Sequence, residues 1–500
     1  MKNIPALWIL VPLLWLAGCN TPPGEAGSRD LGLSSPEAQG ISSQAILQFI
    51  EALEEAQPDA IHSMMLRRHG KVVAEGWWAP YNPESPHLLW SLSKSFTSTA
   101  IGMAQDEGLL SIHDQVISFF PEDAPEDPSV NLQSMRISDL LRMNTGHEQE
   151  PSFRQMEDDN WVRAFLAHEV EHKPGTHFRY NSMATYMCSA ILQKVTGMTL
   201  MEFLTPRLFE PLGIEHPTWE TDPRGINVGG WGLSVTTEDI SKFGQLYLQK
   251  GMWEGKQLIS ETWVKEATAL QTSNGSNPES DWDQGYGYQF WQCRHDAYRG
   301  DGAFGQYCIV MPQQDAVLAM TSGSDDLQGI LNVVWEHLLP ALKEGKLPPD
   351  EEGEEQLRKK MDGLAISTVQ GAESSPLAPE VSGQTYTLES NGGSLQSITF
   401  NFETSDPEIT LTTDGGQQTF SAGHGKPVKG LLTSPMVTSD KVAVSGAWEE
   451  NDTYAVKVIY YETPQSVLYT FRFDGDTLHW NTENRAAFAP RNPGELIAVK

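Results

Sequence analysis

The chain has 500 residues, of which 39% are hydrophobic and 20% are charged, and its formal net charge is −32. This balance is typical of a globular protein, and the length exceeds that of one ordinary core, so we expect two folded domains. The negative charge argues against nucleic-acid binding, which depends on Lys and Arg neutralising phosphates, and against electrostatic docking on anionic lipid.

The first 18 residues are predicted to be a targeting signal. Lys2 precedes an apolar run over residues 4–17, which is too short for a comfortable membrane span. The run ends in LAGC at residues 16–19, which resembles the lipobox of bacterial lipoproteins. That resemblance implies cleavage before Cys19 and acylation of this residue, hence an exported protein held in the cell envelope by lipid, at the outer membrane or periplasmic face if the cell is Gram-negative. An ordinary signal peptide with a chance cysteine is the alternative.

Residues 19–33 are rich in Gly, Pro and small polar residues and are predicted to form a tether. The next region, residues 34–343, has strand patterns at both ends and a mostly helical middle. Apolar spacing predicts helices over 43–57, 91–107, 182–197 and 327–342, and strands over 62–68, 71–78, 288–293, 304–311 and 316–321. We therefore predict an α+β fold with one antiparallel sheet from N- and C-terminal segments and an inserted helical subdomain.

The helix predicted at residue 91 opens with Ser91 and Lys94, which helical geometry places on one face. A serine hydroxyl becomes nucleophilic when a neighbour takes its proton, and a buried lysine can be that neighbour or can poise another base. Backbone N–H groups at the helix start suit a developing oxyanion. An amphipathic helix with a surface lysine would share the spacing, but the apolar residues 101–104 indicate a buried helix.

Two later motifs extend this candidate site. Tyr180 follows a Pro-Gly turn and stands at a loop-to-helix junction, where a side chain can reach a cleft. A phenol near two cations can have a lowered pKa and act as a base, although a tyrosine in such a place, taken alone, more often serves packing. The glycine-rich run at residues 299–306 leads into a strand and lets a backbone edge come close to a ligand, as a tight hairpin turn also would.

The cysteines after Cys19 are Cys188, Cys293 and Cys308. The last two lie on the arms of an expected hairpin, so a disulfide between them and three buried thiols are both open. The spacing of Cys and His predicts no metal site, because nothing matches Cys-x-x-Cys or His-Glu-x-x-His.

The remaining chain divides into a linker and a second domain. Residues 344–378 carry an acidic run at 350–355 and then Ser, Ala and Pro, and we expect a solvated linker. Residues 379–500 show short alternating strands separated by Gly-containing turns and predict an all-β barrel or sandwich, with a closed barrel of about eight strands favoured. This module has no nucleophile–base set, so we expect it to shape access to Ser91, to bind a partner, or to act as a passive appendage.

Together these motifs resemble the serine β-lactamase and penicillin-binding superfamily, in its class-C-related esterase and 6-aminohexanoate-dimer-hydrolase branch. The supporting phrases are residues 140–147, 230–234 and 243–247, and the resemblance covers about residues 36–342. It implies that Ser91 is the nucleophile, Lys94 the motif lysine and Tyr180 the tyrosine of the Tyr-x-Asn element. In place of that element's Asn the chain has Ser182, and its third motif, Gly300-Asp301-Gly302, lacks the usual basic residue.

The expected activity is hydrolysis of esters or amides, including short oligoamides and D-amino-acid peptides, through an acyl-Ser91 intermediate, with membrane contact only through the lipid anchor and with no metal or organic cofactor. In this scheme Tyr180 takes the Ser91 proton, and Ser182, Gly302 and Ala303 are candidates for substrate or oxyanion binding. A β-lactamase or DD-peptidase is the first alternative. A non-catalytic cell-envelope binding lipoprotein with the same fold is the second.

Overall fold

The computed structural model describes residues 32–151, 159–388, 394–435 and 437–500. Its hydrolase region contains a six-stranded antiparallel sheet in the order β2-β1-β11-β10-β9-β8. The strands are β1 (Ile61–Arg68), β2 (Lys71–Trp77), β8 (Trp291–Gln292), β9 (Tyr298–Gly302), β10 (Gln306–Met311) and β11 (Ala316–Ser322). Early and late segments thus share one sheet, which confirms the predicted fold class, although the strand expected over 288–293 is reduced to two residues.

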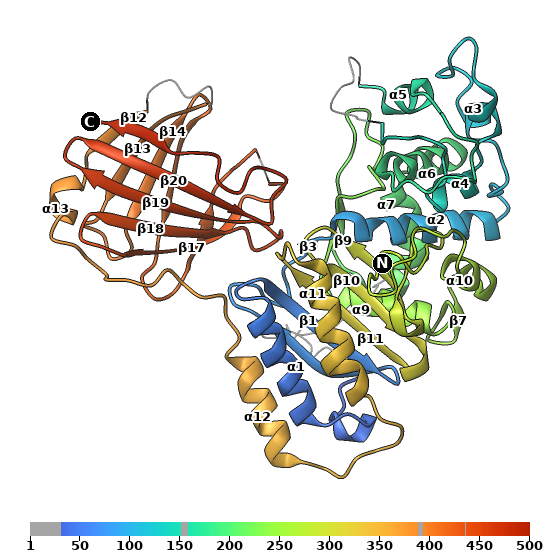
Figure 1. Ribbon diagram of the computed structural model, residues 1–500, viewed down its shortest axis with the longest axis horizontal. Helices are drawn as coiled ribbons and strands as arrows, with labels where there is room; N and C mark the ends of the chain where they lie inside the picture. The colour runs from blue at the N-terminus through green and yellow to red at the C-terminus, as the bar shows by residue number, and fades with distance from the viewer. Residues whose placement is uncertain (1–31, 152–158, 389–393, 436) are drawn as a thin grey trace, which may run out of the picture.

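Helices cover both faces of this sheet (Figure 1). On one face lie α1 (Ser43–Ala56) and α11 (Leu327–Val333), and on the other lies α9 (Thr237–Leu248). Helix α1 begins at the Ser42 N-cap, whose side chain accepts a hydrogen bond from Ala45 N, and it buries Ile46, Phe49, Ile50 and Leu53. The predicted apolar spacing is therefore the face that joins the core.

The helical subdomain lies above the sheet in Figure 1. Its long helices α2 and α6 pack against each other and carry the candidate site residues at their N-terminal ends. The helices between the sheet segments are α2 (Ser93–Asp106), α3 (Val130–Ser134), α4 (Ile137–Leu141), α5 (Trp161–Ala167), α6 (Ser182–Thr196), α7 (Leu200–Leu204), α8 (Glu210–Leu212) and α10 (Glu261–Ala267). Small strands join them: β3 (His87–Leu88), β4 (Thr218–Trp219), β5 (Leu233–Val235), β6 (Met252–Trp253) and β7 (Lys256–Gln257).

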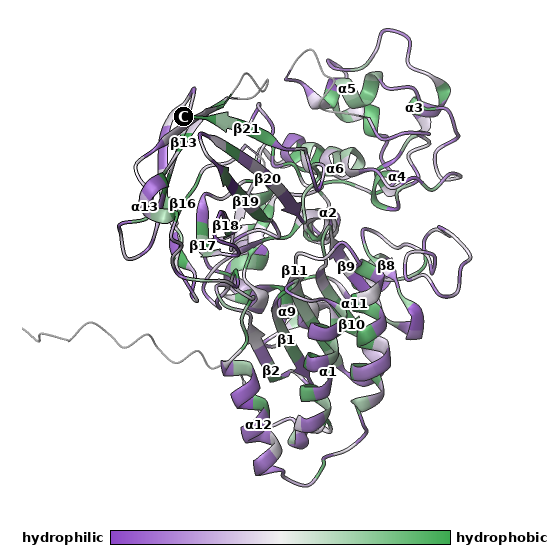
Figure 2. Cartoon of the chain, turned by 60° about the vertical axis from the view of Figure 1, so that its left-hand side comes forward, coloured by the Kyte–Doolittle hydropathy of each residue, from purple (hydrophilic) through white to green (hydrophobic). Residues whose placement is uncertain are grey.

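The segment expected to be a solvated linker contains a helix, α12 (Glu351–Asp362). Asp350 caps its N-terminus by accepting a hydrogen bond from Gly353 N, and the acidic first turn favours the helix dipole. Most of its surface is hydrophilic (Figure 2), but Leu357 is buried against α1. Met361 also packs against this core, so the segment is attached to the hydrolase region rather than a free tether, and the acidic run hid these apolar contacts.

The C-terminal module is one antiparallel sheet of ten strands that curls into a nearly closed barrel (Figure 1). The strands are β12 (Thr385–Leu388), β13 (Leu395–Asn401), β14 (Glu408–Thr413), β15 (Gly416–Ser421), β16 (Val428–Leu431), β17 (Lys441–Trp448), β18 (Thr453–Ile459), β19 (Ser466–Asp474), β20 (Thr477–Arg485) and β21 (Leu496–Val499), with a short helix α13 (Ala378–Val381). The edge strands β15 and β16 meet where Gln418 exchanges hydrogen bonds with Thr433 backbone groups. The predicted β module is confirmed, but eight strands was too few, because the short β12, β16 and β21 and the polar β15 carry weak patterns.

The turn between β18 and β19 docks this module on the hydrolase region. Leu88 N donates a hydrogen bond of 2.9 Å to Glu462 O, and Thr463 is buried in the contact. Lys457 Nζ forms an ion pair of 3.0 Å with Asp59 Oδ2. Backbone, apolar and charged contacts therefore hold the two regions together.

The three described cysteines are free, buried thiols. Cys293 belongs to the core on the α1 face of the sheet, whereas Cys308 belongs to the core on the α9 face. A disulfide between them would have to cross the sheet, so the bonded alternative is wrong. The predicted signal and the lipidated Cys19 lie outside the described residues, and within the described ranges no helix is long and apolar enough to span a bilayer.

Candidate active site

Ser91 stands in a 3-10 turn, Trp90–Leu92, that runs directly into α2. The preceding Trp90 adopts a left-handed φ of 48°, which is costly for a bulky side chain and is typical of functional turns. Lys94 lies one turn further, and its Nζ is 3.0 Å from Ser91 Oγ. The predicted Ser-x-x-Lys spacing therefore brings the two reactive groups into direct contact.

Lys94 is almost completely buried, at 1% exposure. Its Nζ donates hydrogen bonds to Gly230 O at 2.6 Å and to Ser182 Oγ at 3.1 Å. Burial lowers the pKa of Lys94 to about 7, against the opposing attraction of Glu150 and Asp301. A substantial fraction of this amine is therefore neutral near neutral pH, which gives it a lone pair.

Tyr180 lies beside both groups. Lys94 Nζ sits 4.9 Å from the centre of its ring, and its hydroxyl hydrogen-bonds with Ser91. The ring stacks on Trp291 with centroids 5.4 Å apart. Although part of the residue is exposed, crowding of the hydroxyl by protein atoms and the nearby carboxylate of Asp301 raise its pKa above the ordinary value. The expected lowering of this pKa is wrong, because desolvation and the carboxylates outweigh the hydrogen bond with Ser91 and the attraction of Arg299, which both lower it.

The glycines of the third motif let β9 pack directly on the nucleophile segment. A Cβ at Gly302 would lie 2.0 Å from Leu89 O, and one at Gly300 would lie 2.4 Å from a methyl group of Leu92. The glycines are therefore required for the close packing of β9 on the nucleophile segment, whether or not they also let a ligand approach. The approach sets Ala303, the next residue, on the wall of the cavity that contains Ser91.

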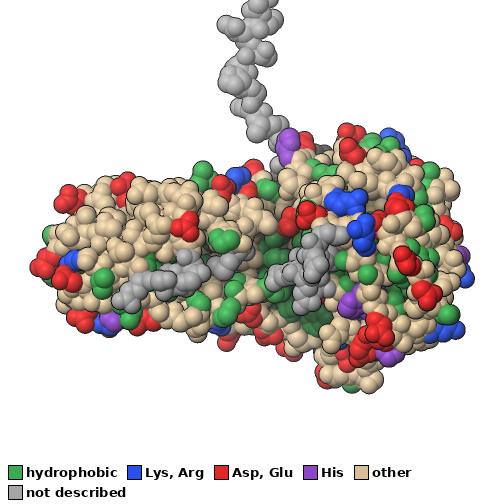
Figure 3. All heavy atoms as spheres, turned by 90° about the horizontal axis from the view of Figure 1, so that it is seen from above, with side chains coloured by type: hydrophobic (Ala, Val, Ile, Leu, Met, Phe, Trp, Pro, Cys, Tyr) green, Lys and Arg blue, Asp and Glu red, His purple; other side chains and the backbone are tan. Residues whose placement is uncertain are grey.

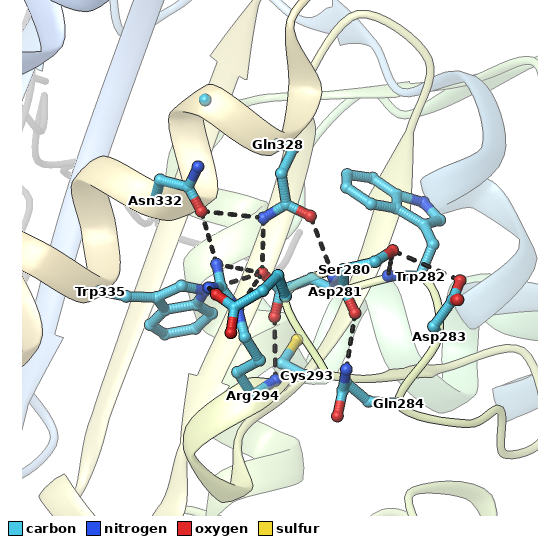
Figure 4. Close-up of polar contacts among 12 residues, drawn as sticks. Ser280, Asp281, Trp282, Asp283, Gln284, Cys293, Arg294, Gln328, Asn332 and Trp335 are labelled. Carbon is cyan, nitrogen blue, oxygen red and sulfur yellow. Dashed lines mark hydrogen bonds and ion pairs between the residues drawn. The ribbon is translucent and has the colours of Figure 1, made fainter. Parts of the chain in front are cut away.

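Asp301 takes the place of the basic residue in that motif, and Arg299 neutralises it. The guanidinium lies 2.8 Å from Asp301 Oδ2, and its Nη1 donates to the backbone oxygen of Asp281. Asp281 is itself the centre of a polar network, in which it accepts hydrogen bonds from Arg294, Gln328 and Trp335 (Figure 4). Arg299 is fully buried and does not line the cavity, so it is not placed to replace the missing basic residue by binding a substrate carboxylate.

A cavity of about 550 Å³ opens at Ser91. Seen from above, hydrophobic side chains gather near the junction of the two lobes (Figure 3). The hydrolase region contributes most of the wall, and the β module contributes two residues. The lining residues are Trp90, Ser91, Glu150, Pro151, Trp161, Ser182, Glu220, Thr221, Val228, Gly230, Trp231, Ala303, Thr438 and Phe488.

Sequence reasoning gave no role to two residues that organise this site. Gly230 supplies the carbonyl that holds Lys94, and a Cβ there would lie 2.6 Å from Ser182 O. Glu150 Oε1 accepts hydrogen bonds from the backbone N–H groups of Ser182 and Met183 at the start of α6. The Gly-Trp-Gly phrase was a usable signal for Gly230, whereas nothing near Glu150 marks a functional carboxylate.

Among the described residues, one group of three side chains brings metal-ligating atoms within 4.8 Å of one another: Glu148, His172 and His177. The closest pair, His172 Nε2 and Glu148 Oε2, is 2.6 Å apart. None of the three lines the cavity at Ser91. The spacing rules missed this group because Glu148 is on a different loop from the two histidines.

A family model described as Beta-lactamase matches residues 50–337, which is more than half of the chain. The chain belongs to the Beta-lactamase family. This membership confirms the superfamily expected from the motifs around Ser91, Tyr180 and Gly302. The match ends before α12 and the C-terminal module, so these parts lie outside the region that the family model covers.

The chain is 27% identical over 302 residues to the 6-aminohexanoate-dimer hydrolase of Paenarthrobacter ureafaciens, covering 55% of this chain and 75% of that protein. It is also 27% identical over 172 residues to protein flp of Staphylococcus aureus strain MW2, but covers only 34% of that protein. A Bacillus anthracis structure assigned as a 6-aminohexanoate-dimer hydrolase aligns with a TM-score of 0.52 at 19% identity, over 64% of this chain and 89% of the other. At this identity the structural likeness shows the fold.

Proposed function

We propose that this protein is a serine hydrolase that cleaves esters or amides through an acyl-Ser91 intermediate. The observation that carries the proposal is the position of Lys94, whose Nζ is buried within 3.1 Å of both Ser91 Oγ and Ser182 Oγ. A neutral amine there can accept the Ser91 proton while it still donates to Gly230 O. The hydrolase relatives of this Beta-lactamase-family chain support the same reaction class.

The lowered pKa of Lys94 and the raised pKa of Tyr180 support the following proton transfers. Lys94 accepts the proton of Ser91 as Oγ bonds to the substrate carbonyl carbon, and the backbone N–H groups of Ser91 and Ala303 stabilise the oxyanion. Tyr180, which keeps its proton, donates it to the leaving group as that bond breaks, and then regains a proton from Lys94. Water next attacks the acyl carbon and gives a proton to Lys94, which passes it to Ser91 Oγ as the acid departs. Tyr180 is thus the acid, in place of the base expected from sequence.

Neutral or cationic substrates suit the cavity better than anionic ones. Glu150 and Glu220 line its wall, and its described lining includes no Lys or Arg side chain. Arg299, the nearest cation to the third motif, is bound to Asp301. A β-lactam or a DD-peptide brings a carboxylate to this position. We therefore place esters and amides without a nearby carboxylate first, then short oligoamides and D-amino-acid peptides, whose terminal carboxylate can lie further from the scissile bond, and then the β-lactamase and DD-peptidase alternatives.

A fluorophosphonate probe and a chromogenic ester test the proposal together. Purified wild-type protein should form a mass adduct at Ser91 and turn over the ester, and Ser91→Ala should abolish both. Ser118→Ala, which changes an exposed serine hydroxyl, is the matched control and should behave as wild type. Equal activity of wild type and Ser91→Ala would overturn the mechanism. A stable adduct without ester, amide or nitrocefin turnover would favour the non-catalytic binding lipoprotein.

We also propose that the mature protein begins at acylated Cys19 and stays in the cell envelope. The support is the LAGC sequence at residues 16–19 after a short apolar run. Cys19→Ala should move the protein from the membrane fraction to the soluble fraction, whereas Cys188→Ala, which alters a buried thiol, should not. A Cys19→Ala protein that stays in the membrane fraction would contradict the lipid anchor.

A further inference from the structure

Three aromatic rings from separate parts of the chain meet at the cavity that contains Ser91: Trp90 and Phe488 line it, and Phe304, which is buried, packs against both. Trp90 directly precedes Ser91, Phe304 directly follows Ala303, and Phe488 comes from the loop between β20 and β21 of the C-terminal module. The ring centroids of Phe488 lie 5.0 Å from Trp90 and 5.0 Å from Phe304, and those of Trp90 and Phe304 are 6.3 Å apart. We call these three side chains the aromatic wall.

The backbone at the aromatic wall is held in costly conformations. Trp90 has a φ of 48° and Phe304 a φ of 67°, both in the left-handed region that bulky residues avoid. Such strain persists when the surrounding structure enforces it, and it concentrates at ligand sites. Here it is found at two large rings whose centroids lie 6.3 Å apart, one next in sequence to Ser91 and the other next to Ala303.

Phe488 is presented to this place by a braced loop. Asn484 N donates a hydrogen bond of 2.7 Å to Arg491 O, its side chain donates to Pro490 O, and Arg491 pairs with Glu483. The loop is therefore closed at its base, and Phe488 projects from it with 67% of its surface exposed. An apolar ring held in water at the mouth of a cavity indicates a surface that a ligand covers.

We propose that the aromatic wall binds a bulky apolar group of the ester or amide substrate, and that Phe488 makes the C-terminal module a determinant of substrate specificity. This inference rests on the proposed hydrolase function. The wall adjoins both the nucleophile and the residue expected at the oxyanion, so an apolar group on either the acyl or the leaving side lies within its reach. Covering Phe488 removes apolar surface from water and favours larger substrates over small ones.

Two matched ester series test this inference. The acyl series compares p-nitrophenyl hexanoate with p-nitrophenyl acetate, and the leaving-group series compares 1-naphthyl acetate with ethyl acetate. Phe488→Ala should lower kcat/KM for the bulkier member of at least one series about tenfold, and for the smaller member about twofold. Phe488→Leu should restore part of the loss. Because Phe488 is mostly exposed, its truncation leaves the fold in place, which thermal unfolding checks.

Leu431→Ala is the matched control, since Leu431 is a 62% exposed apolar residue of the same module that does not line the cavity. Unchanged bulk preference in Phe488→Ala in both series, or an equal change in Leu431→Ala, would overturn the inference while Ser91-dependent turnover stands. Wild-type protein that hydrolyses none of the four esters and forms no Ser91 adduct would overturn the proposed function and the inference with it.

Discussion

The hydrolase region and the β module bury different kinds of side chain. Around Ser91 the hydrolase region encloses Lys94, Arg299 and Asp301, whereas the interior of the module is built from apolar and aromatic residues on alternate strand positions. Buried charged groups are costly unless they are paired, and they have strongly shifted pKa values. The proposed reactive groups therefore belong to the hydrolase region, and the β module contributes only to the surface near them.

The largest effect is expected from removing the amine of Lys94, because the hydrolase region is proposed to hold all the reacting groups. Lys94→Met should reduce kcat for an ester about 10³-fold, because it removes the amine that lies 3.0 Å from Ser91 Oγ and takes its proton in the proposed mechanism. Steady-state ester hydrolysis measures the loss. Lys71→Met, a change at an exposed position on β2, is the control. Retention of more than a tenth of the wild-type kcat in Lys94→Met would assign the base elsewhere.

The pH dependence of acylation also tests whether Lys94 is the base. The pKa of Lys94 is lowered to about 7, so the neutral amine predominates above that value and the ammonium below it. We expect kcat/KM to rise through pH 7 to a plateau, with a fall of about tenfold per pH unit on the acid side. A series of initial rates at low substrate from pH 5 to 9 tests this. A profile that instead rises only near pH 10 would return the role of base to Tyr180.

Separating the two regions should destabilise the hydrolase region but not the β module. A chain that ends at Lys346 loses α12 and the docking turn, and so exposes core positions that Leu357 and Ile459 now cover. We expect its Tm to fall by about 5–10 °C, whereas residues 379–500 alone should keep a β-sheet circular dichroism spectrum because the module has its own core. An unstructured 379–500 fragment would show that the module depends on the hydrolase region.

The smallest expected effect concerns a buried histidine pair in the hydrolase region near the docking turn. His62 Nδ1 lies 3.1 Å from His87 Nε2, and burial lowers the pKa of His87 to about 4 and that of His62 well below its usual value. Between pH 4 and 6.5 the unfolded chain therefore binds more protons than the folded chain. The contribution of this pair to the free energy of unfolding is fully present above pH 6.5 and decreases as the pH falls toward 4. Thermal unfolding at pH 5 and 7.5 measures the difference, which should shrink in His87→Gln.

Much of the fold followed from local pattern. The helix at 43–56, the hairpin of β1 and β2 and the helix that opens after Ser91 were predicted within a residue or two, because each buries one regular face. Prediction failed where few apolar residues anchored the element, as with Leu357 and Met361 in α12, and where short strands had too few residues to establish a period.

The sequence by itself determined the family and predicted the Ser91–Lys94–Tyr180 set, since three motifs in a fixed order are specific even when each alone is weak. Only the tertiary structure decided how protons are held there. Burial and the neighbours of each group set the pKa values, and these neighbours come from distant segments: Gly230 for Lys94, Asp301 for Tyr180 and Arg299 for Asp301. The same reason placed Phe488 beside Trp90, because a contact between residues almost 400 positions apart leaves no mark on either local pattern.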